Sequence, residues 1–414
     1  MSRRWSIFAI TSAHFFLSQF YRSSNAVIAP QLIRDLALDT ETLGLMSASF
    51  FYAFACTQIP LSLLLDRIGA RIMMTGLSLV GILGAFVFSW ADSLGLGLIG
   101  RILLGVGMAC NLMGTLKLVS DWFAPRTFAT LSGVVFSIGT LGNIIATTPL
   151  VLLVEQVGWR NGFQLIAGLN LVLTVMLFFI VRDKPEERQS HSPENSGTNS
   201  FHLALANMKL LFRQKDYWII SLSTLVRYGV FAAFQTLWAG PYLIEVMGYS
   251  AVNAGNLILL MNIGLLTGGP LWGVLSDKLF NTRKWIIVTC LIILAAITFA
   301  FSAIPSGTKL TVLAPLFFGF GFLSGGGLLM YPHIKELMPS DMAGAAMTGI
   351  NFFTMIGSAV FLQGLGSMMQ ALYPDASRGL DAFNAAFLLC VACMTVVAVL
   401  YVFTTEGGLK CEVN

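Results

Sequence analysis

The sequence predicts an all-α integral membrane protein with twelve transmembrane helices in two pseudo-symmetric six-helix bundles, and three observations support it. Of its 414 residues, 56% are hydrophobic and only 11% are charged, whereas soluble chains carry about 25% charged residues. Twelve apolar runs are long enough to cross a bilayer as helices. A single polar segment separates the first six runs from the last six. This composition excludes a soluble enzyme, a disordered chain and a nucleic-acid-binding protein.

The spans follow one another between charged or turn-forming breaks. Residues 185–215, rich in Ser, Asn, Pro and charged residues, predict a cytoplasmic linker between an N-terminal bundle (1–184) and a C-terminal bundle (216–414). The chain starts without a cleavage site typical of a signal peptide. The expected spans are 6–32, 43–65, 72–91, 94–120, 129–154, 161–181, 217–243, 251–275, 285–304, 310–333, 344–370 and 382–404.

The basic residues predict the orientation. With both termini in the cytoplasm, sixteen of the 24 Lys and Arg residues lie in inside loops and tails and four lie outside, as the positive-inside rule requires. We expect a monomer in the lipid bilayer, and short loops indicate a bacterial inner membrane. No cofactor or metal site is implied, because the Cys390-x-x-Cys393 pair lies in an apolar run with no second pair.

The two halves repeat one motif at corresponding places. Spans 2 and 8 each end in an acidic residue followed by a cationic turn on the predicted cytoplasmic side. Internal repeats of this kind are typical of secondary transporters. We expect these clusters to act as gates that hold the bundles in an outward-facing state: Asp66, Arg67 and Arg71 in the first half, and Asp277, Arg283 and Lys284 in the second.

These motifs carry a family resemblance. Ser62-x-x-x-Asp66-Arg67-x-Gly69-x-Arg71 resembles the loop between helices 2 and 3 of the major facilitator superfamily, with Ser62 in place of the usual glycine. Arg101-x-x-x-Gly105, Asp121-Trp122-Phe123-x-Pro125-Arg126 and Gly158-Trp159-Arg160 are further family-like landmarks. The resemblance covers nearly the whole chain and implies two six-helix bundles that rock about a central cavity.

Four basic residues remain inside the predicted spans: Arg22, Arg101, Lys117 and Arg227. A charged side chain at the centre of a span costs about 2.5–3.5 kcal/mol, so such residues indicate function. No acidic residue lies well inside any span, and an anion would supply the missing negative charge. Lys117 either pairs with Asp121 one turn later or lines the cavity exit. Arg101 belongs to the superfamily's helix 4 pattern and is expected to hold helices together.

Arg22 and Arg227 are the expected anion-binding residues. They lie 205 residues apart, in spans 1 and 7, and guanidinium groups bind phosphate and carboxylate through two parallel hydrogen bonds. Tyr21-Arg22 with Asn25 and Pro30 resembles helix 1 of the organophosphate:phosphate antiporter family, and Leu225–Val230 is similar to its helix 7. That resemblance implies that both arginines hold a phosphoryl group, although the sequence after Gln235 looks more like the broader sugar-phosphate-permease-like group. The expected cavity polar groups are Tyr21, Asn25, Gln58, Tyr228, Gln235, Asn262 and Asn351.

The predicted function is secondary active transport of a small organic anion, a phosphorylated or carboxylate metabolite, by alternating access. The coupling partner is a proton or a counter-anion, and His14, two turns before Arg22, is the candidate proton carrier. Three alternatives stay open: a proton-coupled symporter of an amino acid or another nutrient, a multidrug exporter, and a non-transporting ligand sensor of the same fold.

Overall fold

The computed structural model describes residues 3–183, 211–338 and 343–406, and no strand occurs in these ranges. The chain divides into two compact units. Unit 1 contains the described residues up to 183 together with Thr236–Pro241 and Tyr249–Asn256, and unit 2 contains the other described residues. Residues 185–210 of the predicted linker lie outside the described residues, so its boundaries stay a prediction.

Each predicted span corresponds to one or more helices. Unit 1 contains α1 Arg3–Ser23, α2 Asn25–Leu36, α3 Thr40–Ile68, α4 Ala70–Ser89, α5 Leu94–Met108, α6 Asn111–Trp122, α7 Pro125–Ile145 and α8 Thr148–Ile180. The later spans are α10 Lys215–Ala233, η2 Phe234–Trp238, α11 Ala239–Pro241, η3 Tyr242–Val246, α12 Ala251–Val274, η4 Leu275–Phe280, α13 Lys284–Ala303, α14 Leu310–Gly326, η5 Gly327–Leu329, α15 Met330–Leu337, α16 Ala343–Leu372 and α17 Leu380–Val402.

Ten spans in the described ranges are long and apolar enough to cross a membrane. The other two predicted spans coincide with α1 and α2, and with α7 and the start of α8. Span 1 is less apolar because α1 carries three arginines. The predicted all-α membrane fold is therefore confirmed, and the main difference is that α8 continues through the predicted boundary between spans 5 and 6, with a kink at Gly158.

Span 5 is interrupted at Ala146–Thr147, between α7 and α8, and four further spans are interrupted as corresponding pairs in the two halves. Span 1 turns at Ser24 and span 4 turns at Ala109–Cys110. Span 7 contains the π-helical turns η2 and η3, and span 10 contains the 3₁₀ turn η5. Irregular backbone at membrane depth is tolerated where it is buried in protein or lines a cavity, and transporters place their binding sites at broken helices. Spans 1, 4 and 7 carry the intramembrane cations that the sequence singles out.

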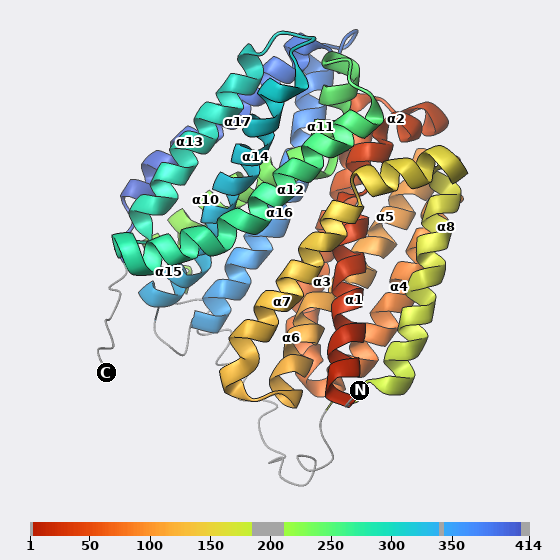
Figure 1. Cartoon of the computed structure of the whole chain (residues 1–414), viewed down its shortest axis with the longest axis vertical. Helices are drawn as coiled ribbons and strands as arrows, with labels where there is room; N and C mark the ends of the chain where they lie inside the picture. Colours follow the sequence, from red (N-terminus) through yellow and green to blue (C-terminus); the bar gives the residue numbers. More distant parts are fainter. Residues whose placement is uncertain (1–2, 184–210, 339–342, 407–414) are drawn as a thin grey trace. The chain divides into compact units, whose positions relative to one another are not determined.

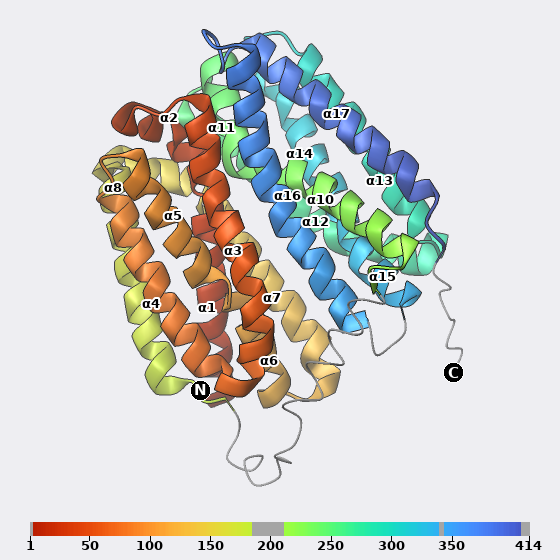
Figure 2. The same cartoon turned by 180° about the vertical axis from the view of Figure 1, so that it is seen from behind.

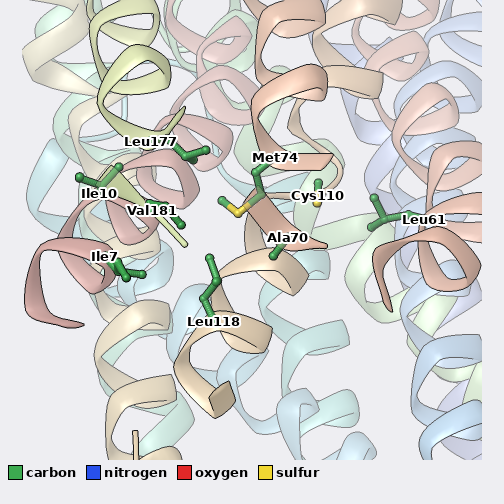
Figure 3. Packing of buried hydrophobic residues seen from close by; sticks show 9 residues of the cluster. All are labelled: Ile7, Ile10, Leu61, Ala70, Met74, Cys110, Leu118, Leu177 and Val181. Atoms are coloured by element: carbon green, nitrogen blue, oxygen red, sulfur yellow. The ribbon is translucent and has the colours of Figure 1, made fainter. Parts of the chain in front are cut away.

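Apolar packing holds each unit together. In unit 1, α1 packs on α6, α7 and α8 (Figure 1). In unit 2, α10 packs on α16 and α17 (Figure 2). Figure 3 shows nine buried residues of one unit 1 cluster, which joins α1, α3, α4, α6 and α8. Close packing of such side chains fixes the positions of the helices and therefore of the polar side chains that they carry. The cluster comprises Ile7, Ile10, Leu61, Ala70, Met74, Cys110, Leu118, Leu177 and Val181.

A polar clasp at one end of unit 1 explains the Gly158-Trp159-Arg160 landmark. Gly158 has φ +78°, a conformation that favours glycine, and the kink directs the next two side chains to Asp35. The Trp159 indole N–H donates to Asp35 Oδ2 at 2.9 Å, and Arg160 Nη1 donates to the same oxygen at 2.8 Å. Arg160 Nη2 also donates to the Ala91 carbonyl at 2.9 Å. The clasp thus ties α2 and the end of α4 to α8.

Asp35→Asn should lower the apparent melting temperature at pH 7, with a cost of about 1 kcal/mol. The Trp159 hydrogen bond, followed by the bonds from Arg34 and Arg160, lowers the pKa of the Asp35 carboxyl. A lowered folded-state pKa stabilises the protein above the ordinary value of 3.8, and this contribution is lost as the pH falls through the folded-state pKa. Thermal unfolding in detergent should therefore show a difference between wild type and variant that narrows below about pH 4. Arg34→Gln, at a side chain that is 76% exposed, is the control with little expected effect, and a constant difference at all pH values would contradict the assignment.

Candidate functional site

Arg227 lies in the middle of α10 and is 3% exposed. Its Nη1 donates to the Ser324 carbonyl of α14 at 2.6 Å, and its guanidinium lies 5.5 Å from the centre of the Tyr228 ring. Its Nε is buried and has no hydrogen-bond partner among the described residues. The described residues supply no carboxylate within ion-pairing distance of it. A buried cation in this state can still accept an anionic partner.

The glycine run at residues 325–327 makes room for this arginine. A Cβ at Gly327 would overlap the Arg227 guanidinium, whereas a Cβ at Gly326 would meet Cys290 and one at Gly325 would meet the backbone of α12. The 3₁₀ turn η5 begins at Gly327. Each glycine therefore allows a different group to pack closely against the backbone, and Gly327 is the one that allows Arg227 to do so.

Two polar clusters lie in unit 2, one on α15 and α16, which pack against α10, and one on η2 and α12. In the first cluster, the Tyr331 hydroxyl of α15 donates to Asn351 Oδ1 at 3.4 Å and lies 3.3 Å from Thr354 Oγ1. The sequence prediction included Asn351 but missed Tyr331 and Thr354.

The second cluster joins two predicted residues. Gln235 Nε2 donates to Asn262 Oδ1 at 2.5 Å, and Asn262 Nδ2 donates to the Ile258 carbonyl at 2.9 Å. Both side chains are buried in unit 2, 1% and 0% exposed. Since Gln235 is the second residue of η2, the π-helical turn positions this amide.

Arg22 lies at the last turn of α1, directly before the interruption at Ser24, and is partly exposed. Hydrogen bonds fix the backbone on both sides of it. Ser23 Oγ donates to Asn143 Oδ1 at 2.7 Å, and Asn25 Nδ2 donates to Ser47 Oγ at 2.9 Å. The interruption is thus tied to α7 and α3, which holds Arg22 where α1 ends and α2 begins.

Other predicted residues of unit 1 have structural partners. Arg101 is completely buried; its Nη1 donates to the Tyr21 carbonyl at 3.0 Å, and its guanidinium lies 5.0 Å from the Phe50 ring centre. The Tyr21 side chain is also fully buried. Gln58 Nε2 donates to the Ala109 carbonyl at 3.2 Å, where span 4 is interrupted. These contacts join α5 to α1 and α3, and the helix-linking role of Arg101 stays a prediction.

His14 is fully buried between α1, α6 and α8. Its Nδ1 lies 2.9 Å from the Ile10 carbonyl, and its Nε2 lies 3.4 Å from Thr174 Oγ1. Asn111 Nδ2 donates to the His14 carbonyl at 3.2 Å. The ring is therefore held by neutral groups.

The predicted gate residues of unit 1 lie at the ends of α3 and α4. The Asp183 carboxylate, which the sequence prediction missed, accepts from the Arg71 backbone N–H at 2.8 Å, close to the first turn of α4. Arg71 Nε donates to the Phe178 carbonyl at 2.9 Å. Asp66 and Arg67 lie in the last turn of α3, and the Asp66 side chain is outside the described part of the structure.

Two of the three predicted gate residues of unit 2, Asp277 and Arg283, form an ion-pair cluster with Glu336. Arg283 contacts Asp277 at 2.6 Å and Glu336 of α15 at 3.0 Å. Lys284 does not join this cluster, because its Nζ donates to the Thr404 carbonyl at 2.8 Å. The sequence prediction missed Glu336, which completes the cluster. Lys117, whose side chain is partly exposed on α6, keeps both of its predicted roles open.

The sequence model of the Major Facilitator Superfamily matches residues 11–362. Relatives include the probable sulfoacetate transporter SauU of Cupriavidus necator, 23% identical over 380 residues (86% of each chain). The hexuronate transporter of Bacillus subtilis is 25% identical over 382 residues (89% of this chain and 86% of that one). The probable galactarate/D-glucarate transporter GarP of Escherichia coli is 25% identical over 415 residues (92% and 90%).

Solved structures with the same fold are transporters. A bacterial homologue of the human lysosomal transporter Spinster, inward-facing and unoccupied, has a TM-score of 0.78 at 16% identity and covers 97% of this chain and 96% of its own. A D-xylose–proton symporter has a TM-score of 0.75 at 15% identity, with 95% and 97% covered. At these identities the likeness concerns the fold alone.

Proposed function

The chain belongs to the Major Facilitator Superfamily, and we propose that it moves a small organic anion across the membrane with Arg22 and Arg227 as its anion-binding residues. Each unit contributes one of these arginines from an interrupted span. Their pairing across the two units stays a prediction. The observation that carries the proposal is Arg227, which is buried in a span, has an Nε without a hydrogen-bond partner among the described residues, and lies 5.5 Å from the centre of the Tyr228 ring.

The relatives support a carboxylate or a sulfonate over a phosphate ester. Sulfoacetate, hexuronate, galactarate and glucarate, the substrates named for three of them, are all small anions, and most carry several hydroxyl groups. Guanidinium forks suit the acidic groups. We propose that Tyr228, Gln235, Asn262 and Asn351 hydrogen-bond the rest of the substrate, and that the end clusters around Arg71 and Arg283 act as gates.

A thermal-shift screen of the detergent-purified protein tests the substrate class. Glucuronate, glucarate, sulfoacetate, glycerol 3-phosphate, alanine and glucose are compared at the same concentrations. We expect stabilisation by carboxylates or by the sulfonate, since a ligand at 100 times its Kd stabilises by about 2.7 kcal/mol. Stabilisation by glucose or alanine alone would contradict the proposal, and stabilisation by glycerol 3-phosphate alone would restore the phosphate-ester class.

A further inference from the structure

We propose that His14 and Thr174 form a reversible proton-binding pair whose proton travels with the anion, so that transport is proton symport; the link to transport rests on the proposed function above. Both residues lie inside unit 1, on α1 and α8, and are 0% and 1% exposed. The pair lies outside the set of predicted anion-binding residues.

The hydrogen bonds of His14 define which nitrogen carries its proton. A carbonyl oxygen can only accept, so the 2.9 Å contact to the Ile10 carbonyl requires a hydrogen on Nδ1. In the neutral ring, Nε2 is then an unprotonated acceptor. It faces Thr174 Oγ1 at 3.4 Å, and that hydroxyl already donates to the Asn170 carbonyl at 2.8 Å. A lone pair of Nε2 and a lone pair of Thr174 Oγ1 thus face each other, and one additional proton can bind between these two atoms.

One hydroxyl rotation accommodates both charge states. When Nε2 binds a proton from water, the Nε2–H donates to Thr174 Oγ1, while the threonine hydroxyl keeps its bond to Asn170. When the proton leaves to water, the Thr174 hydroxyl can rotate and donate to the bare Nε2. Because each state has a hydrogen-bond partner, binding and release of the proton leave no buried group unsatisfied.

The surroundings of the pair lack a carboxylate to balance the imidazolium. Its hydrogen-bonded neighbours, Thr174 and Asn170 of α8 and Asn111 of α6, are neutral. Among the described side chains, the ionisable residues on the elements packed against α1 include no hydrogen-bond partner of His14; they are Arg101 of α5, Lys117 and Asp121 of α6, Glu155 and Arg160 of α8, and Arg34 and Asp35 of α2. The Arg126 side chain of α7 lies outside the described part of the structure. The compensating negative charge can therefore come with the transported anion.

The spacing of His14 and Arg22 along α1 determines how strongly proton binding and anion binding favour each other. His14 and Arg22 are eight residues apart on α1, which is about 12 Å along a helix. At an effective dielectric constant of about 20, attraction across that distance raises the affinity for either partner about tenfold when the other is bound. An anion held by Arg22 would thus favour the protonated ring, and release of either partner would favour release of the other.

The test is ¹⁵N NMR of the full chain labelled at its four histidines, with the His14 signal identified by its loss in His14→Gln. We expect the neutral His14 ring to carry its hydrogen on Nδ1. In Thr174→Val, whose side chain cannot accept the Nε2–H, the titration midpoint should move at least about one pH unit lower. Thr174→Ser, which keeps the hydroxyl, should retain the wild-type midpoint.

The matched control is Thr298→Val, which removes the same kind of bond from a buried threonine of α13 to the carbonyl four residues earlier, in unit 2. A neutral ring protonated at Nε2, measurable in the wild type alone, would overturn the proposal, as would equal midpoints in wild type and Thr174→Val. Addition of glucuronate, glucarate or sulfoacetate should raise the midpoint. If these anions bind without moving the His14 titration midpoint, the proposed coupling between proton and anion is wrong. If none of them binds, the proposed function is wrong, and the titrations of wild type and Thr174→Val alone decide whether the proton site exists.

Discussion

Arg227→Lys should lower the rate of anion uptake by roughly 100-fold while the folded protein keeps its stability. Lysine keeps the positive charge but loses the planar fork, and each charge-assisted hydrogen bond to an anion contributes about 1.5–3 kcal/mol. The bond to the Ser324 carbonyl can be made by an ammonium group, so the contact between α10 and α14 can persist. Uptake into proteoliposomes, together with the melting temperature of the detergent-purified variant, measures both effects.

Arg34→Lys is the matched control, since it makes the same exchange at an arginine whose side chain is 76% exposed. It should transport at the wild-type rate. Wild-type uptake by Arg227→Lys would remove this arginine from the binding site. A large loss of melting temperature in the same variant would instead assign it a structural role.

Gly327→Ala should reduce uptake at least tenfold, although alanine favours the helical backbone by about 1 kcal/mol relative to glycine. The new Cβ would overlap the guanidinium of Arg227, and Gly327 has an ordinary φ of −70°, so the backbone itself is not strained by the change. The arginine must move, and the anion-binding position moves with it. Uptake and ligand-induced thermal shift should fall together.

Gly364→Ala of α16 is the control for this change, because a Cβ at Gly364 meets no atom within 4 Å. Its uptake should equal that of the wild type. If Gly327→Ala were equally active, the close packing of the glycine against Arg227 would have no part in binding.

The membrane spans are predictable from the sequence because a helix in a bilayer must present about 20 apolar residues in one run. The same reasoning finds Arg22, Arg101 and Arg227, since a cation stands out in an apolar run. The breaks at Ala109–Cys110 and at Gly327 are different. Gly327 ends a run of three glycines, which is a local signal for a bend, whereas Ala109–Cys110 contains neither glycine nor proline, and only packing against other elements determines that break.

The partners of the predicted residues also cannot be predicted from the sequence, because tertiary packing brings them together. Glu336 lies 53 residues from Arg283 and contacts it only after folding. Thr174 lies 160 residues from His14, and a threonine in an apolar helix is usually satisfied by its own backbone. Tyr331 likewise meets Asn351 through tertiary packing. The sequence therefore identifies the intramembrane cations, and the structure identifies which groups contact them.

Uptake of radiolabelled glucuronate, glucarate or sulfoacetate into proteoliposomes with an imposed proton gradient tests the central claim most directly. The account predicts accumulation of at least one of these anions above its external concentration, with loss of accumulation in Arg22→Lys and Arg227→Lys. Binding of an anion without net uptake or exchange under any gradient would contradict it and would indicate a ligand sensor of the same fold.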